Sequence, residues 1–208
     1  MNRRTHTIFC IRHGRPGLRY SHTPWRWLTA GEMNGLLDAY DAVGLHPEWN
    51  AARLDEMKNA IAAERWHAIT TAHSLSSDLP RAFETALLYT RRDASEVPSS
   101  SIYRETPLAR FRWTGLKLPT MALLALVRLG WYTGWMQCTE SRTETHARVR
   151  AAADQLEQHA ADHHRIAVYS HGFFLWLLGR ELRRRGWHST KTGPYRYLEP
   201  AEFQRPVG

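Results

Sequence analysis

Two short segments of this sequence place a histidine and a glycine just after an apolar run. Arg12-His13-Gly14 follows residues 8–11, and His171-Gly172 follows residues 165–169. An imidazole in such a position can act as a nucleophile if one ring nitrogen is free and the other is held by an acceptor. The guanidinium of Arg12 can bind an anion through its planar set of N–H donors, and glycine lets the backbone approach a ligand closely. These segments therefore indicate chemistry on a negatively charged group.

A third segment, residues 76–86, adds a second guanidinium. Arg81 falls in the first turns of an expected helix, where an oxyanion would meet the helix amides and the guanidinium together. Taken alone, each segment also fits a structural role. Arg81 could pair with Glu84 or Thr85 along one helix face, and His171 could be a core histidine bonded to the backbone. The conjunction of the three segments is more specific than any one of them.

Together the three segments resemble the histidine phosphatase superfamily, which includes the cofactor-dependent phosphoglycerate mutases. Arg12-His13-Gly14 is similar to the nucleophile motif of that family, and His171 matches its second histidine. Arg81 matches the arginine of the family's Ser-x-Leu-x-Arg-Ala-x-x-Thr-Ala segment. The motifs come in the family's order and span most of the chain. The resemblance implies a phosphatase that passes through a phosphohistidine on His13.

The resemblance also implies a general acid near the third expected strand. Glu105 lies where the acid of the family falls, and Glu84 and Glu140 are the alternatives. Glu84 also fits a salt bridge along its helix, and Glu140 also fits a favourable charge before a helix N-terminus. We expect Glu105 to protonate the leaving oxygen and then to deprotonate the water that hydrolyses phosphohistidine.

The remaining site residues follow from the same resemblance. Neutral His13 would attack phosphorus. The charged groups of Arg12, Arg81 and protonated His171 would hold the phosphate oxygens. Two guanidiniums and an imidazolium supply the charge that other phosphatases take from metal ions, so we expect no metal and no other cofactor. The residues expected to bind the phosphate are Arg12, Gly14, Arg81 and Gly172.

Two departures from the family pattern bear on the reaction. Ser170 stands where many members have glycine, and residues 15–20 lack the acidic residue, Trp and Asn that members with mutase activity usually carry. The second departure favours a phosphatase over a phosphoglycerate mutase-like phosphomutase. A non-catalytic phosphate- or phosphoprotein-binding module is a further alternative, which would bind phosphate esters without releasing inorganic phosphate.

The pattern of apolar residues predicts strands that alternate with helices. The expected strands are residues 7–11, 68–72, 102–105 and 165–169. The expected helices are residues 47–66, 77–89, 119–129, 141–163 and 173–185, with an irregular tail over 187–208. We therefore predict an α/β fold, a three-layer α/β/α sandwich with a central, mostly parallel sheet. Ligands bind beyond the carboxyl ends of strands in such sheets. The residues after the four expected strands are His13, His73, Glu105 and His171.

The length and composition favour one domain over residues 1–208. With 43% hydrophobic residues the 208-residue chain can build a full core. The segments around 15–45 and 106–136 are expected to be insertions that form a lid over the pocket. The tryptophans in these segments could wall the pocket mouth and admit an organic group beside the phosphate.

The net charge and the lengths of the apolar runs limit which classes of partner we expect. The formal net charge of +8 suits an anionic partner, and the only lysines are Lys58, Lys117 and Lys191. No nucleic-acid-binding motif is present, and no apolar run approaches the roughly 20 residues of a membrane-spanning helix. We expect a small phosphorylated substrate, no nucleic acid and no membrane, and a cytoplasmic location by default. The sequence leaves the substrate and the oligomeric state open.

Metal and disulfide sites are not expected. Cys10 and Cys138 make no disulfide framework. His159 and His163 are four residues apart on an expected helix, a spacing that can bind a metal ion. No Glu or Cys lies where a third ligand would be expected, so a solvated helix end is predicted there.

Overall fold

The central sheet is built from four parallel strands and one antiparallel edge strand. The structure is a computed structural model, and it describes residues 5–18, 25–110, 115, 117–135, 139–189 and 194–207. The five strands lie in the order β4-β3-β6-β1-β7, in which only β7 runs antiparallel to its neighbour β1. Their bounds are β1 (Thr5–Arg12), β3 (His73–Ser77), β4 (Ser99–Ser100), β6 (Arg165–Ser170) and β7 (Pro200–Pro206).

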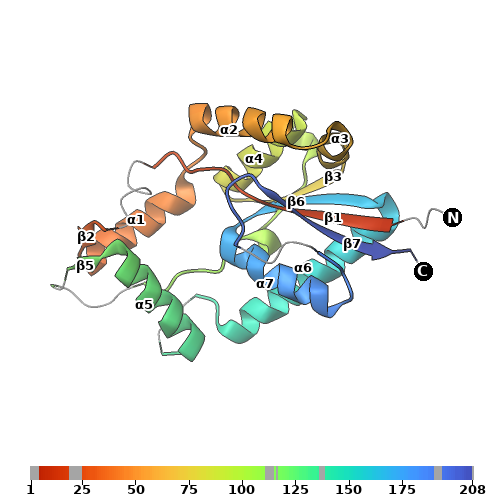
Figure 1. Cartoon of the computed structure of the whole chain (residues 1–208). Coiled ribbons are helices and arrows are strands. Elements are labelled where there is room, and N and C mark those ends of the chain that lie inside the picture. Colours follow the sequence, from red (N-terminus) through yellow and green to blue (C-terminus); the bar gives the residue numbers. More distant parts are fainter. Residues whose placement is uncertain are drawn as a thin grey trace.

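Both faces of this sheet are covered by helices, because successive strand residues point to opposite faces. In β1, Ile8 and Cys10 belong to the core under α6 (Arg142–His163) and α7 (Gly172–Arg184), while Phe9 and Ile11 belong to the opposite core. That opposite core lies under α2 (Pro47–Ala60), α3 (Ala63–Thr70) and α4 (Pro80–Thr90), and Figure 1 shows the two helix layers above and below the sheet. The predicted three-layer α/β/α sandwich is confirmed.

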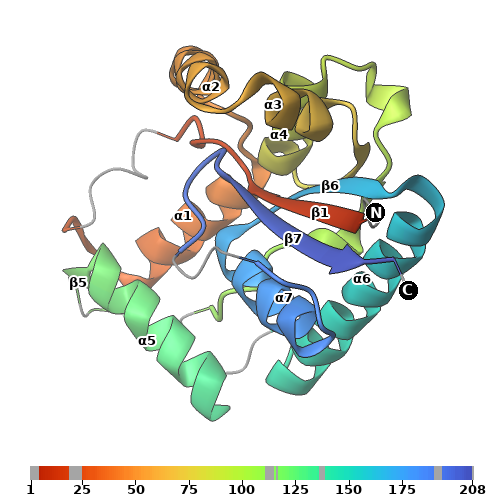
Figure 2. The same cartoon turned by 45° about the vertical axis from the view of Figure 1, so that its right-hand side comes forward.

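Two segments that are far apart in the sequence pack together beside the sandwich. We call them the cap: β2 (Trp27–Leu28), α1 (Ala30–Ala42), β5 (Leu118–Pro119) and α5 (Thr120–Thr133). Strands β2 and β5 pair antiparallel. The helices bury a small core of their own, which includes Met33, Leu37, Leu123 and Val127. Figures 1 and 2 show α1 and α5 side by side, away from the sheet.

Several predicted boundaries are confirmed. Helix α6 begins with the expected capping box, in which Ser141 accepts from the Glu144 N–H and the Glu144 carboxylate accepts from the Ser141 N–H. Gly186, just beyond α7, has a φ of 84°, the left-handed conformation that glycine adopts without strain. Of the described residues, none lies in a helix that is long and apolar enough to cross a membrane.

The prediction was wrong around the second strand. The helix expected over 47–66 ends at Ala60, and the strand expected over 68–72 is the end of α3 and a turn. Ile69 is buried, but it lies in helix α3. A short apolar run fits a buried helix as well as a buried strand. The strand itself is the serine-rich β3, which begins at His73. His73 therefore lies at the amino end of β3 and not beyond its carboxyl end.

Three other predicted elements also differ. Ser77 ends β3, and the N-cap of α4 is Leu79, followed by Pro80 in the first turn. Residues 101–103 form a 3₁₀ turn instead of a strand, and the short strand lies before them in β4. The tail contains β7, whose prolines stand at its two ends. An edge strand tolerates proline because one side of its backbone has no pairing neighbour.

Candidate active site

Strands β1 and β6 end side by side and bring the two His-Gly segments together. The register pairs Arg12 with Ser170, so His13 and His171 leave the sheet as neighbours, with ring centroids 5.0 Å apart. The His13 N–H donates to the Ser170 carbonyl oxygen at 2.8 Å. Both histidines are buried, with 1% and 0% of their surface exposed. Parallel pairing thus places them at the carboxyl edge of the sheet, where ligands bind in this fold class.

The ring of His13 is held with one nitrogen unprotonated. Nδ1 lies 2.7 Å from the Gly14 carbonyl oxygen, which can only accept, so Nδ1 carries the proton and Nε2 carries the lone pair. Burial, followed by the charges of Arg81 and Arg12, holds the His13 pKa well below its usual range. The imidazole is therefore neutral near pH 7. A neutral imidazole with a free Nε2 is the form that can attack phosphorus.

The loop after β1 is fixed from both sides by polar groups. A Cβ on Gly14 would lie 2.1 Å from the Asn50 Oδ1 atom, so only glycine fits there. Asn50, buried in α2, accepts from the Arg15 N–H at 2.7 Å, and the Gly14 N–H donates to the Thr85 hydroxyl at 2.9 Å. Thr85 and Asn50 are positioning residues that sequence reasoning did not assign to the site. Thr85 belongs to the Arg-Ala-x-x-Thr-Ala pattern, which was the signal for it.

Arg81 points away from its own helix and into the site. It is fully buried, its Nη1 donates to the Tyr40 carbonyl oxygen at 2.6 Å, and its guanidinium carbon lies 4.2 Å from the Tyr40 ring centroid. The alternative of a pair with Glu84 is wrong, because the Glu84 carboxylate accepts instead from the Leu45 N–H at 2.6 Å. Among the described residues, the carboxylate that Arg81 meets is that of Asp41, with Nη2 and Oδ1 3.5 Å apart.

Arg12 supplies a second guanidinium on the other side of the histidines. Its Nη1 donates to the Tyr195 carbonyl oxygen at 3.0 Å, and its guanidinium carbon lies 4.1 Å from the Tyr197 ring centroid. A Cβ on Gly172 would lie 3.1 Å from the Arg12 Nε atom. Gly172 therefore permits the close packing of Arg12 against the start of α7.

The ring of His171 contacts Ser77, which was expected only as the first residue of a helix. Its Nε2 lies 3.0 Å from the Ser77 hydroxyl, which also accepts from the Leu79 N–H. Burial, followed by the charges of His13, Arg81 and Arg12, holds the His171 pKa well below its usual range. The imidazole is neutral near pH 7, and the protonated form expected from the resemblance requires an anion beside it.

Four buried nitrogen atoms in this group have no hydrogen-bond partner among the described residues. They are Nε of Arg12, Nε and Nη2 of Arg81, and Nδ1 of His171. Buried polar groups without partners are uncommon in folded proteins, because each costs the lost hydration of that group. An oxyanion bound next to His13 would satisfy them. The arrangement can therefore hold a phosphoryl group against a nucleophilic imidazole.

A sequence model of the histidine phosphatase superfamily (branch 1) matches residues 51–196. The chain belongs to the histidine phosphatase superfamily. The matched region contains Arg81 and His171, and His13 lies before it, so the tertiary structure completes the set. Members of the superfamily include phosphatases and mutases. No curated protein matches the sequence significantly.

Solved structures with the same fold are distant in sequence. "Mycobacterial hydrolase 1" has a TM-score of 0.60 at 20% identity, over 97% of this chain and 92% of that chain. A mycobacterial glucosyl-3-phosphoglycerate phosphatase has a TM-score of 0.58 at 19% identity, over 97% and 91%. A phosphoglycerate mutase from Bacillus anthracis has a TM-score of 0.56 at 18% identity, over 99% and 90%. These likenesses establish the fold of this superfamily member.

The Glu105 carboxylate lies against the first turn of α7, the helix that follows His171 in the sequence. Its Oε1 accepts from the Thr106 N–H at 2.9 Å and the Phe174 N–H at 3.0 Å, and its Oε2 accepts from the Phe173 N–H at 3.3 Å. The Phe173 and Phe174 amides belong to the first turn of α7, where the helix dipole favours negative charge. The structure thus brings Glu105 to the edge of the site without a β-strand before it.

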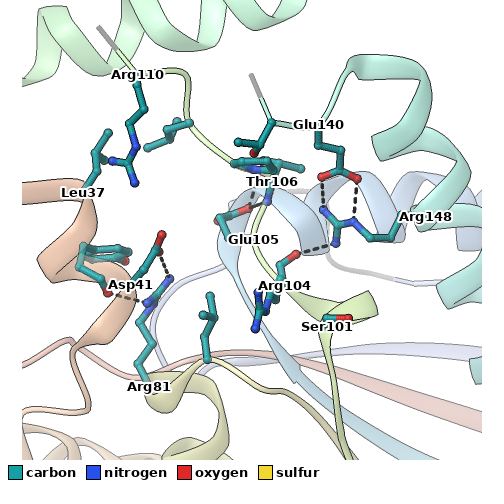
Figure 3. Close-up of a pocket in the computed structure, with 15 residues that line it drawn as sticks. Leu37, Asp41, Arg81, Ser101, Arg104, Glu105, Thr106, Arg110, Glu140 and Arg148 are labelled. Atoms are coloured by element: carbon teal, nitrogen blue, oxygen red, sulfur yellow. Dashed lines mark hydrogen bonds and ion pairs between the residues drawn. The ribbon is translucent and has the colours of Figure 1, made fainter. Parts of the chain in front are cut away.

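A cavity of about 440 Å³ opens beside Arg81 and Glu105, and Figure 3 shows its lining. Arg81 and Glu105 line it together with α1 residues. Glu140, the other alternative acid, lines the far wall in a bidentate pair with Arg148, at 2.8 and 2.7 Å. Glu140 is therefore engaged by a guanidinium, while Glu84 does not line the cavity.

Two α1 residues approach the catalytic group from the cap, and neither was identified from the sequence. The Tyr40 hydroxyl lies 3.5 Å from the Nε2 atom of His13, and Asp41 faces the Arg81 guanidinium. Figure 3 shows Asp41 and Arg81 pointing toward each other across the cavity. A phosphate on Arg81 must replace the Asp41 carboxylate there. No local pattern marks these residues, because α1 reaches the site only through the packing of the cap.

Proposed function

We propose that this protein is a phosphatase that hydrolyses a phosphomonoester through a phosphohistidine on His13, without a metal ion. One observation carries the proposal: a neutral imidazole with an unprotonated Nε2 lies among buried nitrogens of Arg12, Arg81 and His171 that have no hydrogen-bond partner among the described residues. One of them, Nη2 of Arg81, has only the 3.5 Å ion pair with Asp41. Those groups fit the three equatorial oxygens of a phosphoryl group in transfer. Their positive charge serves the purpose that a metal ion serves elsewhere.

In the first step, the His13 Nε2 lone pair forms a bond to phosphorus while the bond from phosphorus to the leaving oxygen breaks. The leaving oxygen takes a proton from the Glu105 carboxyl. In the second step, water attacks the phosphohistidine and gives a proton to Glu105, which releases inorganic phosphate and restores neutral His13. The proton taken from Glu105 is thus returned to it, as general acid–base catalysis requires.

Of the two Glu105 oxygens, we assign proton transfer to Oε2. Oε1 accepts two backbone N–H groups at 2.9 and 3.0 Å, and Oε2 has only the longer contact with Phe173 at 3.3 Å. The strongly held Oε1 anchors the carboxyl at the start of α7. A proton on Oε2 leaves the two shorter hydrogen bonds to Oε1 intact. Glu105→Gln, with the same shape and no transferable proton, should retain phosphate binding and lose turnover.

The cavity beside the site supports a small organic phosphate as the substrate class. Leu37, Leu79 and Pro107 form an apolar part of its lining. Three arginines also line it, and each is paired with a carboxylate: Arg104 with Asp78, Arg110 with Asp38, and Arg148 with Glu140. One of the similar solved structures is a glucosyl-3-phosphoglycerate phosphatase, and a polar organic group of that kind suits a cavity of mixed character.

The decisive experiment measures inorganic phosphate release from a panel of phosphomonoesters in EDTA. The wild type is compared with His13→Ala and with His67→Ala, an exposed histidine on α3 that serves as the matched control. We expect release by the wild type and the control, and none by His13→Ala. Quenching in alkaline detergent should trap a ³²P-phosphoenzyme in Glu105→Gln when the labelled ester has a good leaving group that needs no proton, and the trapped phosphate should be stable to base and labile to acid. Release that requires a metal, or that survives in His13→Ala, would contradict the proposal.

A further inference from the structure

Three histidines from two elements gather at the other end of the sheet from the phosphate site. His73 opens β3, and His159 and His163 lie one turn apart near the end of α6. One ring nitrogen of each lies within 4.8 Å of the others. The four-residue spacing in the sequence identifies the pair His159 and His163 on α6. The ring of His73 comes beside that pair through the packing of α6 against the sheet.

The three rings are stacked on one another. The centroid of His73 is 4.0 Å from that of His163, with an interplanar angle of 7°, and 4.9 Å from that of His159. The packing of α6 against β3 thus already places three imidazoles, which bind metal ions in their neutral form, side by side.

One ring nitrogen of the cluster makes no hydrogen bond to the described residues. Nε2 of His73 is buried and has no hydrogen-bond partner among the described residues. His163 is exposed at the end of its helix, so its ring is free to turn about its side-chain bonds. In a tetrahedral site with metal–nitrogen bonds of about 2.1 Å, ligand nitrogens lie roughly 3.4 Å apart. Rotation of His159 and His163 can close the remaining separation.

We propose that His73, His159 and His163 form a binding site for a first-row transition-metal ion, with Zn²⁺ as its representative. Neutral imidazoles suit Zn²⁺, Ni²⁺ or Cu²⁺, whereas Mg²⁺ and Ca²⁺ prefer oxygen ligands. Three histidines leave a fourth position for water. Arg92 lines the same hollow as His73 and His163 and opposes a cation, so binding is weaker than at a closed four-ligand site.

The ion has a structural effect and takes no part in phosphoryl transfer. His73 begins β3 and Ser77, which contacts His171, ends it, so about 13 Å of strand separates the ion from the reaction. The ion would join the start of β3 to the end of α6. Because it binds the folded chain, it should raise Tm by about 5 °C when zinc is present in hundredfold excess over its dissociation constant.

The test is equilibrium dialysis of the chelator-treated, full-length protein against Zn²⁺, with bound zinc measured by elemental analysis. We expect one equivalent in the wild type and in His67→Gln, and a loss of at least tenfold in affinity in His163→Gln and His159→Gln. His163 is exposed, so its variant should fold normally and show the wild-type Tm without zinc. With Co²⁺, the wild type should show the intense visible bands of tetrahedral coordination, and His163→Gln should not.

Two results would overturn the proposal. One is a wild type that binds no zinc, or that binds it as well after His163 and His159 are replaced. The other is zinc that survives in His163→Gln but disappears in His13→Ala, because the ion would then lie at the active-site histidines. The readout is independent of phosphatase activity, so a failure of the proposed function leaves this test intact. Turnover in EDTA should be unchanged in His163→Gln.

Discussion

The residues of the active site are charged or neutral according to their surroundings and not according to their type. His13 and His171 would each be partly protonated near pH 6.5 in water, and burial beside two guanidiniums makes both neutral. For His13 this neutrality keeps the lone pair that the proposed attack on phosphorus needs. For His171 it means that the positive charge on the ring must arrive with the ligand.

A dianion should therefore bind with the uptake of a proton by His171. Its pKa lies well below 6.5 in the free protein and rises when a dianion sits beside it. Between those two values the ring is neutral when free and protonated when bound, so affinity falls about tenfold per pH unit as pH rises. Sulfate, which stays dianionic there, is the probe. Calorimetry of His13→Ala in buffers of different ionisation enthalpy should show the uptake.

The same measurement has a matched control. His13→Ala/His171→Asn should bind sulfate more weakly and without proton uptake. An unchanged uptake in the double variant would assign the proton to another group.

Asp41 should compete with phosphate for Arg81. Its carboxylate lies 3.5 Å from the Arg81 guanidinium and is more than half exposed. Exposed ion pairs are weak, so Asp41→Asn should tighten sulfate binding by about two- to fivefold and lower KM in proportion. Asp38→Asn, which breaks the Arg110 pair on the same helix, is the control and should leave sulfate affinity unchanged. Weaker sulfate binding in Asp41→Asn would show that Asp41 helps to hold the anion.

At the scale of elements, the β1 loop depends on a close contact with α2. Gly14→Ala would push a methyl group into Asn50. The variant should lose about 1–3 kcal/mol of folding stability, and His13 should be displaced. The loss should appear as a lower Tm together with a lower kcat. Gly31→Ala is the control, since a Cβ there meets nothing within 4 Å and α1 should become slightly more stable. Equal Tm values for the two variants would refute this account of the loop.

At the scale of the whole molecule, we propose that the cap is a lid that governs access to the site. It buries a core apart from the two sheet cores, and its α1 carries Tyr40 and Asp41 to the catalytic group. The solvent-facing aromatic residues of the cap are Trp27 and Tyr132, and Trp25 and Trp135, which flank it in the sequence, are also exposed, whereas Trp131 is buried. Trp113 lies outside the described residues.

Loosening the cap core should weaken substrate binding while the sandwich stays folded. Leu123 is fully buried among the cap residues, and Leu123→Ala should destabilise the cap by about 2–4 kcal/mol. Hydrogen exchange should then quicken in α1 and α5 and stay slow in β1 and β6. KM for an organic ester should rise more than the dissociation constant for sulfate. Uniformly faster exchange would mean that the cap unfolds together with the sheet.

Sequence reasoning was most successful where a local pattern has one physical meaning. The apolar runs of β1 and β6 are buried on both sides, and the capping box at Ser141 satisfies the backbone N–H groups of Ser141 and Glu144 within the helix end itself. It was least successful where a run fits two structures, as in 68–72, or where pairing across the sheet makes a strand from a proline-containing tail, as in β7.

Local sequence patterns are enough to identify the chemistry that is available: a histidine after β1, a second after β6, and an arginine at the start of α4. How these groups act depends on their tertiary surroundings. The Gly14 carbonyl selects the free nitrogen of His13, burial removes the charge of His171, and the cap brings Tyr40 and Asp41 over the site. Protonation and proximity depend on groups from distant segments, and no local pattern encodes which distant segments will meet.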